Sequence, residues 1–240
     1  MKTWQKILIS MLITLAFCGA YLFSVWRQRQ NPGVIGQNDA RQTRNMDNLV
    51  VMRAFFPMHF EDTLRLENTT VWMKNGYLMP YYPYTGGHVQ FARRVGVIPA
   101  TQRLEVKNIV KQAAPAGEDD GISHGSRQVF AVFALPGGAA LYATPIEAIQ
   151  GNEEAYFCDM LFYYDDPHTI YDHWPKDVWA AIDAHQVKPG MSELETRMAI
   201  GKNLHSGGDK EGDRTVTYDQ AGKHWTVTYF KNQATSIKSE

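Results

Sequence analysis

The sequence predicts an α+β protein in three parts: a single N-terminal transmembrane helix, a mainly antiparallel β domain, and a C-terminal α-α-β-β-β domain. Three patterns carry this prediction. Residues 7–26 are apolar and uncharged, residues 49–165 hold short β-prone runs between turn residues, and residues 166–240 place two helix signals before three strands. Because 44% of the residues are hydrophobic and 12% aromatic, the chain can bury substantial cores.

The run over residues 7–26 is the first element. As a helix its twenty residues would extend about 30 Å, the thickness of the hydrocarbon core of a bilayer. Trp4 and Trp26 bracket it as membrane-interface rings, with basic residues on both sides. We therefore expect residues 1–29 to be a signal-anchor that contacts lipid through residues 7–26. The protein would be single-pass in a bacterial inner (cytoplasmic) membrane, with its C-terminal domains in the periplasm.

Two other interpretations of this segment remain. A cleaved signal peptide would end near Cys18-Gly19-Ala20, although the apolar run continues beyond that point. A lipoprotein would use Cys18, and the residues before it resemble a lipobox except that Phe17 stands where a small residue is expected.

Charge and cysteine usage exclude some classes of protein. Four of the 24 basic residues precede residue 30, which leaves twenty against 25 acids, or about −5, for the rest. We therefore expect no nucleic-acid partner. Cys18 and Cys158 lie in separate apolar runs, so no disulfide framework is available, and we expect Cys158 to be a core residue.

In residues 30–48 the apolar residues do not recur at helix or strand spacing, which predicts a flexible tether. In the β domain over 49–165, the pair Asn75-Gly76 separates two β-prone runs, residues 71–74 and 77–79. Such a pair tolerates positive φ at both positions and favours a tight hairpin, although the prolines that follow limit the second arm.

Five more strands are expected, over residues 88–92, 104–110, 129–135, 139–143 and 156–164. Pro136-Gly137-Gly138 predicts a tight turn between the third and fourth of these. The spacing suggests a small, partly open barrel of the SH3-like kind. The last strand is apolar on both faces apart from Asp159, so we expect it to be covered on both sides.

The C-terminal domain over 166–240 begins with helix signals. Pro175 suits the first position of one helix, and a second begins where Ser192 and Glu195 form a capping box and ends at Gly201. Three strands follow, over residues 214–218, 223–230 and 234–238. In the middle strand Trp225, Val227 and Tyr229 alternate with polar residues, which predicts one buried face and one solvent-exposed face.

This order carries a family resemblance. Val187-Lys188-Pro189-Gly190-Met191-Ser192, a short helix to Gly201 and then WTVTYFKNQATSI resemble the BamE/SmpA family and its β-lactamase-inhibitor-like fold, over residues 174–240. The resemblance implies a binding or scaffold module of the cell envelope. It implies structural roles for Gly190, Met191, Ser192 and Gly201 and no active-site residue.

Residues 121–125, Gly-Ile-Ser-His-Gly, fit the nucleophile-elbow pattern. That elbow needs a strand before the serine and a helix after it, whereas here an acidic loop over 117–120 precedes and a strand follows. A flexible loop is the simpler interpretation. The acids of the loop also lack the spaced oxygen ligands of a calcium loop.

His168, Asp172 and His173 are candidate metal ligands, because a helical turn after Pro167 would place His168 and Asp172 on one face. The alternative is structural. Asp166 would cap the turn, and His173 would pack at a joint between domains.

Tyr77, Tyr81, Tyr82 and Tyr84 lie in a segment interrupted by proline and glycine. As rigid amphipathic side chains they are candidates for partner binding. The alternative is that they cover the end of the barrel.

Together these patterns predict a membrane-anchored envelope protein that acts as a non-catalytic interaction or scaffold module, an accessory subunit without a cofactor. Its partners would be the bilayer and another envelope or membrane protein. The alternative is a membrane-tethered hydrolase or metal-dependent enzyme that uses the His- and Asp-bearing loops. A sensor or polysaccharide-binding module is a third possibility, since small β units serve many roles.

Overall fold

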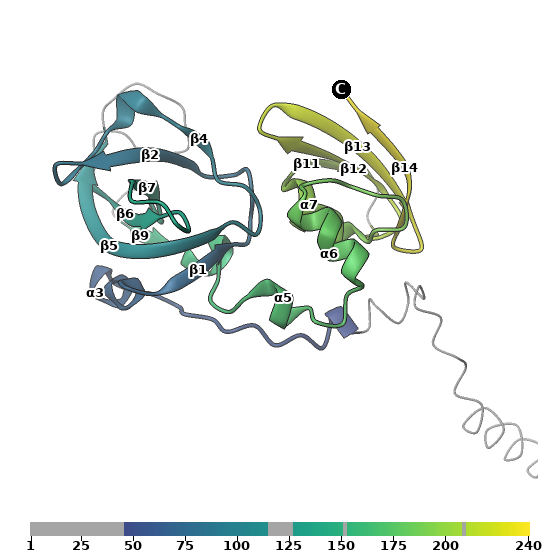
Figure 1. Ribbon diagram of the computed structural model, residues 1–240, viewed down its shortest axis with the longest axis horizontal. Coiled ribbons are helices and arrows are strands. Elements are labelled where there is room, and N and C mark those ends of the chain that lie inside the picture. Colours follow the sequence, from purple (N-terminus) through teal and green to yellow (C-terminus); the bar gives the residue numbers. More distant parts are fainter. Residues whose placement is uncertain (1–45, 115–126, 151–152, 208–209) are drawn as a thin grey trace, which may run out of the picture. The chain divides into compact units, whose positions relative to one another are not determined.

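The computed structural model describes residues 46–114, 127–150, 153–207 and 210–240, all of which belong to one compact unit (Figure 1). This part of the chain is mainly antiparallel β-sheet. Strands β1–β7 and β10 form one eight-stranded sheet, β8 and β9 form a two-stranded sheet, and β11–β14 form a four-stranded sheet.

The expected transmembrane helix requires correction. In the described ranges no helix is long and apolar enough to cross a membrane, and α6 (Lys176–Asp183) and α7 (Glu193–Ile200) have only eight residues each. A bilayer-spanning helix needs about 20. The expected span over residues 7–26, with Trp4 and Trp26, lies outside the described residues. The fold class is therefore corrected to mainly antiparallel β-sheet, and the signal-anchor, the single-pass topology, the lipid contact and the inner-membrane location are withdrawn.

The eight-stranded sheet has the order β10-β1-β5-β6-β7-β2-β3, with β4 paired to β2. Its strands are β1 (Thr70–Met73), β2 (Pro80–Thr85), β3 (His88–Val89), β4 (Gly96–Val97), β5 (Arg103–Ala113), β6 (Arg127–Ala134), β7 (Leu141–Pro145) and β10 (Phe162–Tyr163). Short helices α3 (Phe60–Thr63), η1 (Leu64–Leu66) and η2 (Phe91–Arg93) accompany them. The sheet has more strands than the small, partly open SH3-like barrel that was expected, and pairing among the described strands does not return from β3 to β10.

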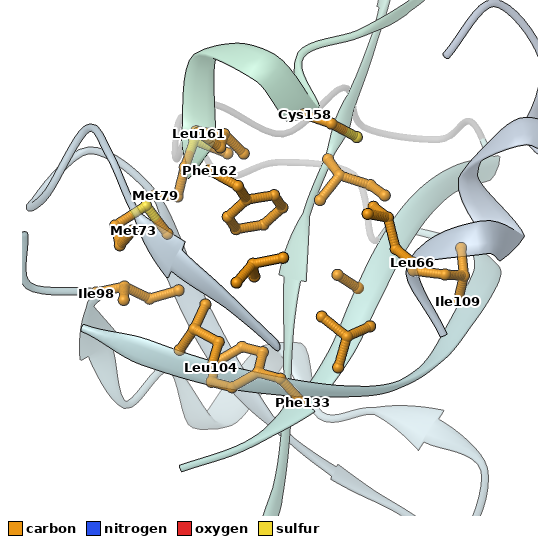
Figure 2. Packing of buried hydrophobic residues seen from close by; sticks show 14 of the residues in the cluster. Leu66, Met73, Met79, Ile98, Leu104, Ile109, Phe133, Cys158, Leu161 and Phe162 are labelled. Atoms are coloured by element: carbon orange, nitrogen blue, oxygen red, sulfur yellow. The ribbon is translucent and has the colours of Figure 1, made fainter. Parts of the chain in front are cut away.

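Strand β6 lies at the centre of this sheet and is buried on both faces. Val129, Ala131 and Phe133 face one hydrophobic cluster, whereas Phe130 and Val132 face another. Figure 2 shows the first cluster, in which Phe133, Leu104 and Phe162 converge with side chains from α4 (Cys158–Leu161). The tight turn at residues 136–138 joins β6 to β7 as expected, with Gly137 at φ 73°.

The hairpin expected at Asn75-Gly76 is wrong. Strand β1 pairs with β5 and β10 and not with β2. A Cβ on Gly76 would overlap the backbone of Ala100, the Asn75 amide donates to the Met160 carbonyl, and Tyr77 rather than Gly76 has positive φ. These tertiary contacts direct the chain away from β1, which local propensity alone could not show.

The continuous strand expected over residues 156–164 is also wrong. Tyr156 ends β9 (Glu153–Tyr156), which pairs with β8 (Glu147–Gln150), and then α4 makes a single turn before β10. The Asp159 carboxylate explains the break, because it accepts the backbone amides of Phe55 at 2.7 Å and Phe56 at 2.8 Å. Cys158 is fully buried, as expected, and burial raises the pKa of its thiol to about 12.

The four-stranded sheet has the order β11-β12-β13-β14, with helices α6 and α7 against one face. Its strands are β11 (Lys202–Gly207), β12 (Thr215–Gln220), β13 (Lys223–Phe230) and β14 (Gln233–Ser239). Two helices and the three expected strands are confirmed, and β11 is an additional edge strand. The capping box of Ser192 and Glu195 is present, and Gly201 follows α7 at φ 81°. Val227 and Tyr229 are buried, as the alternation in β13 predicts.

Between the two large sheets, α5 (Pro167–Ile170) begins after Asp166. Aromatic side chains that precede and follow α5 in the sequence belong to one hydrophobic cluster, in which Trp72 of β1 and Tyr163 of β10 pack with Trp174. The division of the chain into domains over residues 49–165 and 166–240 stays a prediction.

Candidate functional site

A groove of about 720 Å³ lies between the two large sheets. Its lining comes from the turn after β1, from β4 and α4, and from the start of β11 and the β12–β13 hairpin. A second cavity of about 250 Å³ shares Leu78 and Lys202 with it, so the two cavities adjoin. Such a volume lies within the range of ligand-binding clefts.

Tyr77 joins the two sheets at one end of the groove. Its backbone has φ 60°, and its hydroxyl accepts a hydrogen bond from Gln220 Nε2 at 3.3 Å. The ring meets the edge of His185 at a centroid distance of 6.1 Å, and burial raises the pKa of the Tyr77 hydroxyl. A Cβ on Gly201 would overlap the Tyr77 ring, so the glycine that ends α7 also allows the two sheets to approach.

Exposed apolar side chains line the groove. Met160 on α4 is 58% exposed and Leu78 is 37% exposed, although each lies beside core residues such as Leu161 and Met79. Large apolar side chains that line a concave surface mark a binding site more often than scattered ones do.

The charge around the groove is mainly positive. Arg94 and Lys202 line the main cavity, and Arg197 lines the adjoining one. Among the described residues no carboxylate forms an ion pair with any of the three. Asp219 is the acid of this lining, and its carboxylate accepts the Gly222 amide at 2.6 Å. The groove therefore favours an anionic ligand group.

Lys74 lies near Arg197 but does not line either cavity. Burial, followed by the charge of Arg197, lowers the pKa of Lys74, whose Nζ donates to the Asp159 carbonyl at 3.3 Å. The ammonium also lies 5.6 Å from the centre of the Tyr163 ring.

Strand β4 gives the groove a free sheet edge. Gly96 and Val97 both line the groove, and among the described strands β4 pairs with β2 alone. Free edges are where extended peptides add to a sheet.

The groove does not carry an evident catalytic set. The described residues of its lining include no serine, threonine, cysteine or histidine. A Ser–His or Cys–His pair is therefore not available at this place.

Comparisons with protein-family models, curated proteins and solved structures found no match. The resemblance of residues 174–240 to the BamE/SmpA family stays a prediction.

The structure does not bring the three candidate metal ligands together. His168 Nδ1 lies 3.0 Å from Asp166, its Nε2 lies 3.2 Å from Asp183, and its ring stacks on Trp179 at 4.0 Å. Asp166 also caps α5 by accepting the His168 amide, which is the structural role weighed for it. These contacts give His168 a local role in packing α5 against α6.

Asp172 is exposed, whereas His173 points to Asp47 with Nε2 2.7 Å from the carboxylate. In the described part of the chain no group of three or more His, Cys, Asp and Glu side chains is placed to hold a metal ion.

The four tyrosine candidates have different surroundings. Tyr77 lines the groove, but Tyr82 is fully buried and is therefore not available to a partner. Tyr81 packs against Phe133 and Tyr142, and Tyr84 packs at the edge of the cluster around Tyr82.

The structure does not describe the remaining candidate site residues. Trp4, Trp26, the acidic loop over 117–120 and the Gly-x-Ser-x-Gly pattern over 121–125 lie outside the described residues.

Sequence reasoning missed Arg94, Met160 and Lys202 as groove residues. They come from three distant segments, and each alone resembles an ordinary surface residue. Met160 gave one usable signal, because it follows Asp159 within an otherwise apolar run and could have indicated a break with an exposed apolar side chain.

Proposed function

We propose that this chain is a non-catalytic protein-interaction module that binds an extended, acidic and apolar segment of a partner protein in the groove between its two large sheets. The observation that carries the proposal is the combination of an apolar lining with three cations that have no described acidic partner.

Each part of the groove supports one property of the partner segment. Met160 and Leu78 favour apolar side chains, and Arg94 and Lys202 favour carboxylates. The free edge of β4 at Gly96 favours an extended backbone, because main-chain hydrogen bonds give strand addition its affinity and side-chain pockets give it specificity.

The enzyme alternative lacks comparable support. Its histidines are engaged elsewhere, since His168 contacts Asp166 and Asp183 and His173 contacts Asp47. None of these residues lines the groove.

The test uses the full chain and a fluorescein-labelled seven-residue peptide that alternates leucine with glutamate. A second peptide with lysine in place of glutamate is the matched probe. Fluorescence polarisation should show tighter binding of the acidic peptide, with affinity falling as salt rises because the attraction is screened.

Variants locate the binding. Arg94→Glu combined with Lys202→Glu should weaken the acidic peptide at least tenfold, about 1.4 kcal/mol. Met160→Ser, which removes an apolar side chain from the lining without adding a charge, should weaken both peptides. Arg93→Glu is the matched control, because Arg93 is exposed next to Arg94 but does not line the groove. Equal binding of the two peptides, or no effect of the double charge reversal, would contradict the proposal.

A further inference from the structure

A separate cavity of about 290 Å³ lies beside the start of β1, and its described lining shares no residue with that of the groove. The lining comes from residues 53–55, from η1 and the residues that lead into β1, and from Tyr164 after β10. Figure 1 draws residues 53–55 within the trace that leads to α3. Pockets that bind small ligands begin at about this volume.

Two arginines make this cavity positive. Arg53 and Arg65 line it, and the described residues of the lining include no aspartate or glutamate. The Asp165 carboxylate lies 3.7 Å from Arg53, but both side chains are more than half exposed, and such an ion pair contributes little. Asp62 lies near Arg65, but its carboxylate accepts two backbone amides, and no described acid forms an ion pair with Arg65.

The walls of the cavity are aromatic and held in place. The Phe55 ring lies 5.7 Å from the Tyr164 ring, and the Phe55 amide donates to Asp159 at 2.7 Å. Arg53 donates to the Tyr164 carbonyl at 2.6 Å, and the guanidinium carbon of Arg65 lies 5.0 Å from the centre of the Phe55 ring. Because a guanidinium has five N–H donors, these contacts leave most of the donors of both arginines available to a ligand.

The lining also holds uncharged donors. The Ala54 amide and the Thr70 hydroxyl form no hydrogen bond with another described residue, and both residues line the cavity. An amide and a hydroxyl can each donate to an anionic oxygen. The cavity therefore combines cations, neutral donors and aromatic walls.

We propose that this cavity binds an aryl phosphate, a phosphate monoester whose ester group is an aromatic ring. Two guanidinium groups match the charge of a phosphate monoester, about −1.5 to −2 at pH 7, better than the single charge of a carboxylate. The planar guanidinium fork also suits phosphate oxygens. Phe55 and Leu66 give the aromatic ring an apolar surface, which inorganic phosphate would leave unused.

The first test is isothermal titration calorimetry of the full chain with phenyl phosphate, above pH 7, where the phosphate is close to a dianion. Phenyl phosphate should bind at least tenfold more tightly than benzoate, which has the ring but one charge, and than inorganic phosphate, which lacks the ring. If either bound as tightly as phenyl phosphate, the proposal would be wrong. A phosphotyrosine tripeptide that binds more tightly than phenyl phosphate would support a protein source of the aryl phosphate, and one that binds more weakly would support a free small molecule.

Charge-removing variants locate the binding. Arg53→Gln combined with Arg65→Gln should weaken phenyl phosphate binding at least tenfold. Arg103→Gln is the matched control, because Arg103 also lies 3.7 Å from a carboxylate, that of Glu105, and is 50% exposed, but it does not line the cavity. Unchanged affinity in the double variant, or an equal loss in the control, would overturn the proposal.

Asp165→Asn gives a test that poor folding cannot imitate, because a gain of affinity is expected. Removing this carboxylate frees Arg53 for the ligand, so phenyl phosphate should bind about two- to fivefold more tightly. Arg94→Glu combined with Lys202→Glu, the variant that tests the groove, should leave phenyl phosphate binding unchanged, so the two proposals fail separately. Unchanged or weaker binding by Asp165→Asn, or loss of binding in the groove variant, would contradict the assignment of the ligand to this cavity.

Discussion

Oδ1 of Asp47 lies 2.7 Å from Nε2 of His173, and each of the two side chains is 9% exposed. The same oxygen accepts the indole N–H of Trp174 at 2.8 Å. This contact attaches the start of the described chain to the region between the two large sheets, 126 residues further on. Asp47 falls within residues 30–48, for which the sequence predicted a flexible tether.

Replacing Asp47 should release this attachment. Asp47→Ala leaves the Trp174 N–H without an acceptor, and hydrogen bonds to a charged group contribute about 1.5–3 kcal/mol each. We expect the free energy of unfolding to fall by roughly 2–4 kcal/mol and trypsin to cleave faster after Arg53. Asn48→Ala, at the exposed neighbouring position, is the control. Equal cleavage rates in the two variants would show that the contact does not hold the segment.

Glu195 should make stability depend on pH. Burial raises the pKa of its carboxyl above the ordinary 4.5, and the Asp47 carboxylate adds to this, although hydrogen bonds from Ser192 oppose it. The folded chain then keeps this proton to a higher pH than the unfolded chain. The contribution of Glu195 to stability is therefore full below pH 4.5 and declines as pH rises through the raised value.

Glu195→Gln tests this sign, because glutamine stays neutral and its carbonyl can still accept the Ser192 amide. The free energy of unfolding of the variant, relative to the original chain, should increase from pH 4 to pH 7 in denaturant titrations. Glu61→Gln, an exposed change of the same kind, controls for the lost charge. If the free energy of unfolding of Glu195→Gln fell with pH relative to that of the original chain, the pKa of Glu195 would be lowered and not raised by folding.

Gly76 should tolerate no side chain. A Cβ there would overlap the backbone of Ala100, which cannot rotate away. We expect Gly76→Ala to lower the free energy of unfolding by about 2–3 kcal/mol. Gly96→Ala is the matched change on the groove, since its Cβ would meet only Tyr81 Cε1 at 3.8 Å. Similar thermal unfolding of the two variants would contradict the packing described.

Tyr82 should be a core residue and not a contact residue. It is fully buried on β2, so Tyr82→Ala should lower the free energy of unfolding by about 3–5 kcal/mol. Phe230→Ala, which removes an exposed ring, should change it by less than about 0.5 kcal/mol. A Tyr82→Ala variant of normal stability would restore the docking role considered for this residue.

Sequence patterns predicted the C-terminal part well because its signals are local. The capping box at Ser192, the glycine at 201 and the alternation around Val227 depend on neighbours within a few residues. The strands over 104–110 and 129–135 were predictable for the same reason.

The two wrong predictions, the hairpin at Asn75-Gly76 and the strand over residues 156–164, have the same cause. Asn75-Gly76 has the composition of a hairpin, but Gly76 is needed for the approach of Ala100, which lies 24 positions away. The run over 156–164 has the composition of a strand, but Asp159 serves amides about a hundred positions earlier. In both cases a long-range contact outweighs local propensity.

By itself the sequence determined which segments form strands and helices over much of the described chain, and it placed Cys158 in the core, because periodicity and capping act over short distances. Only the tertiary structure decided strand order, the burial of Tyr82 and the meeting of Arg94, Met160 and Lys202 around one groove. Those outcomes depend on which surfaces pack together. The free energy of that packing comes from contacts between residues that are distant in the sequence, so no short segment predicts it.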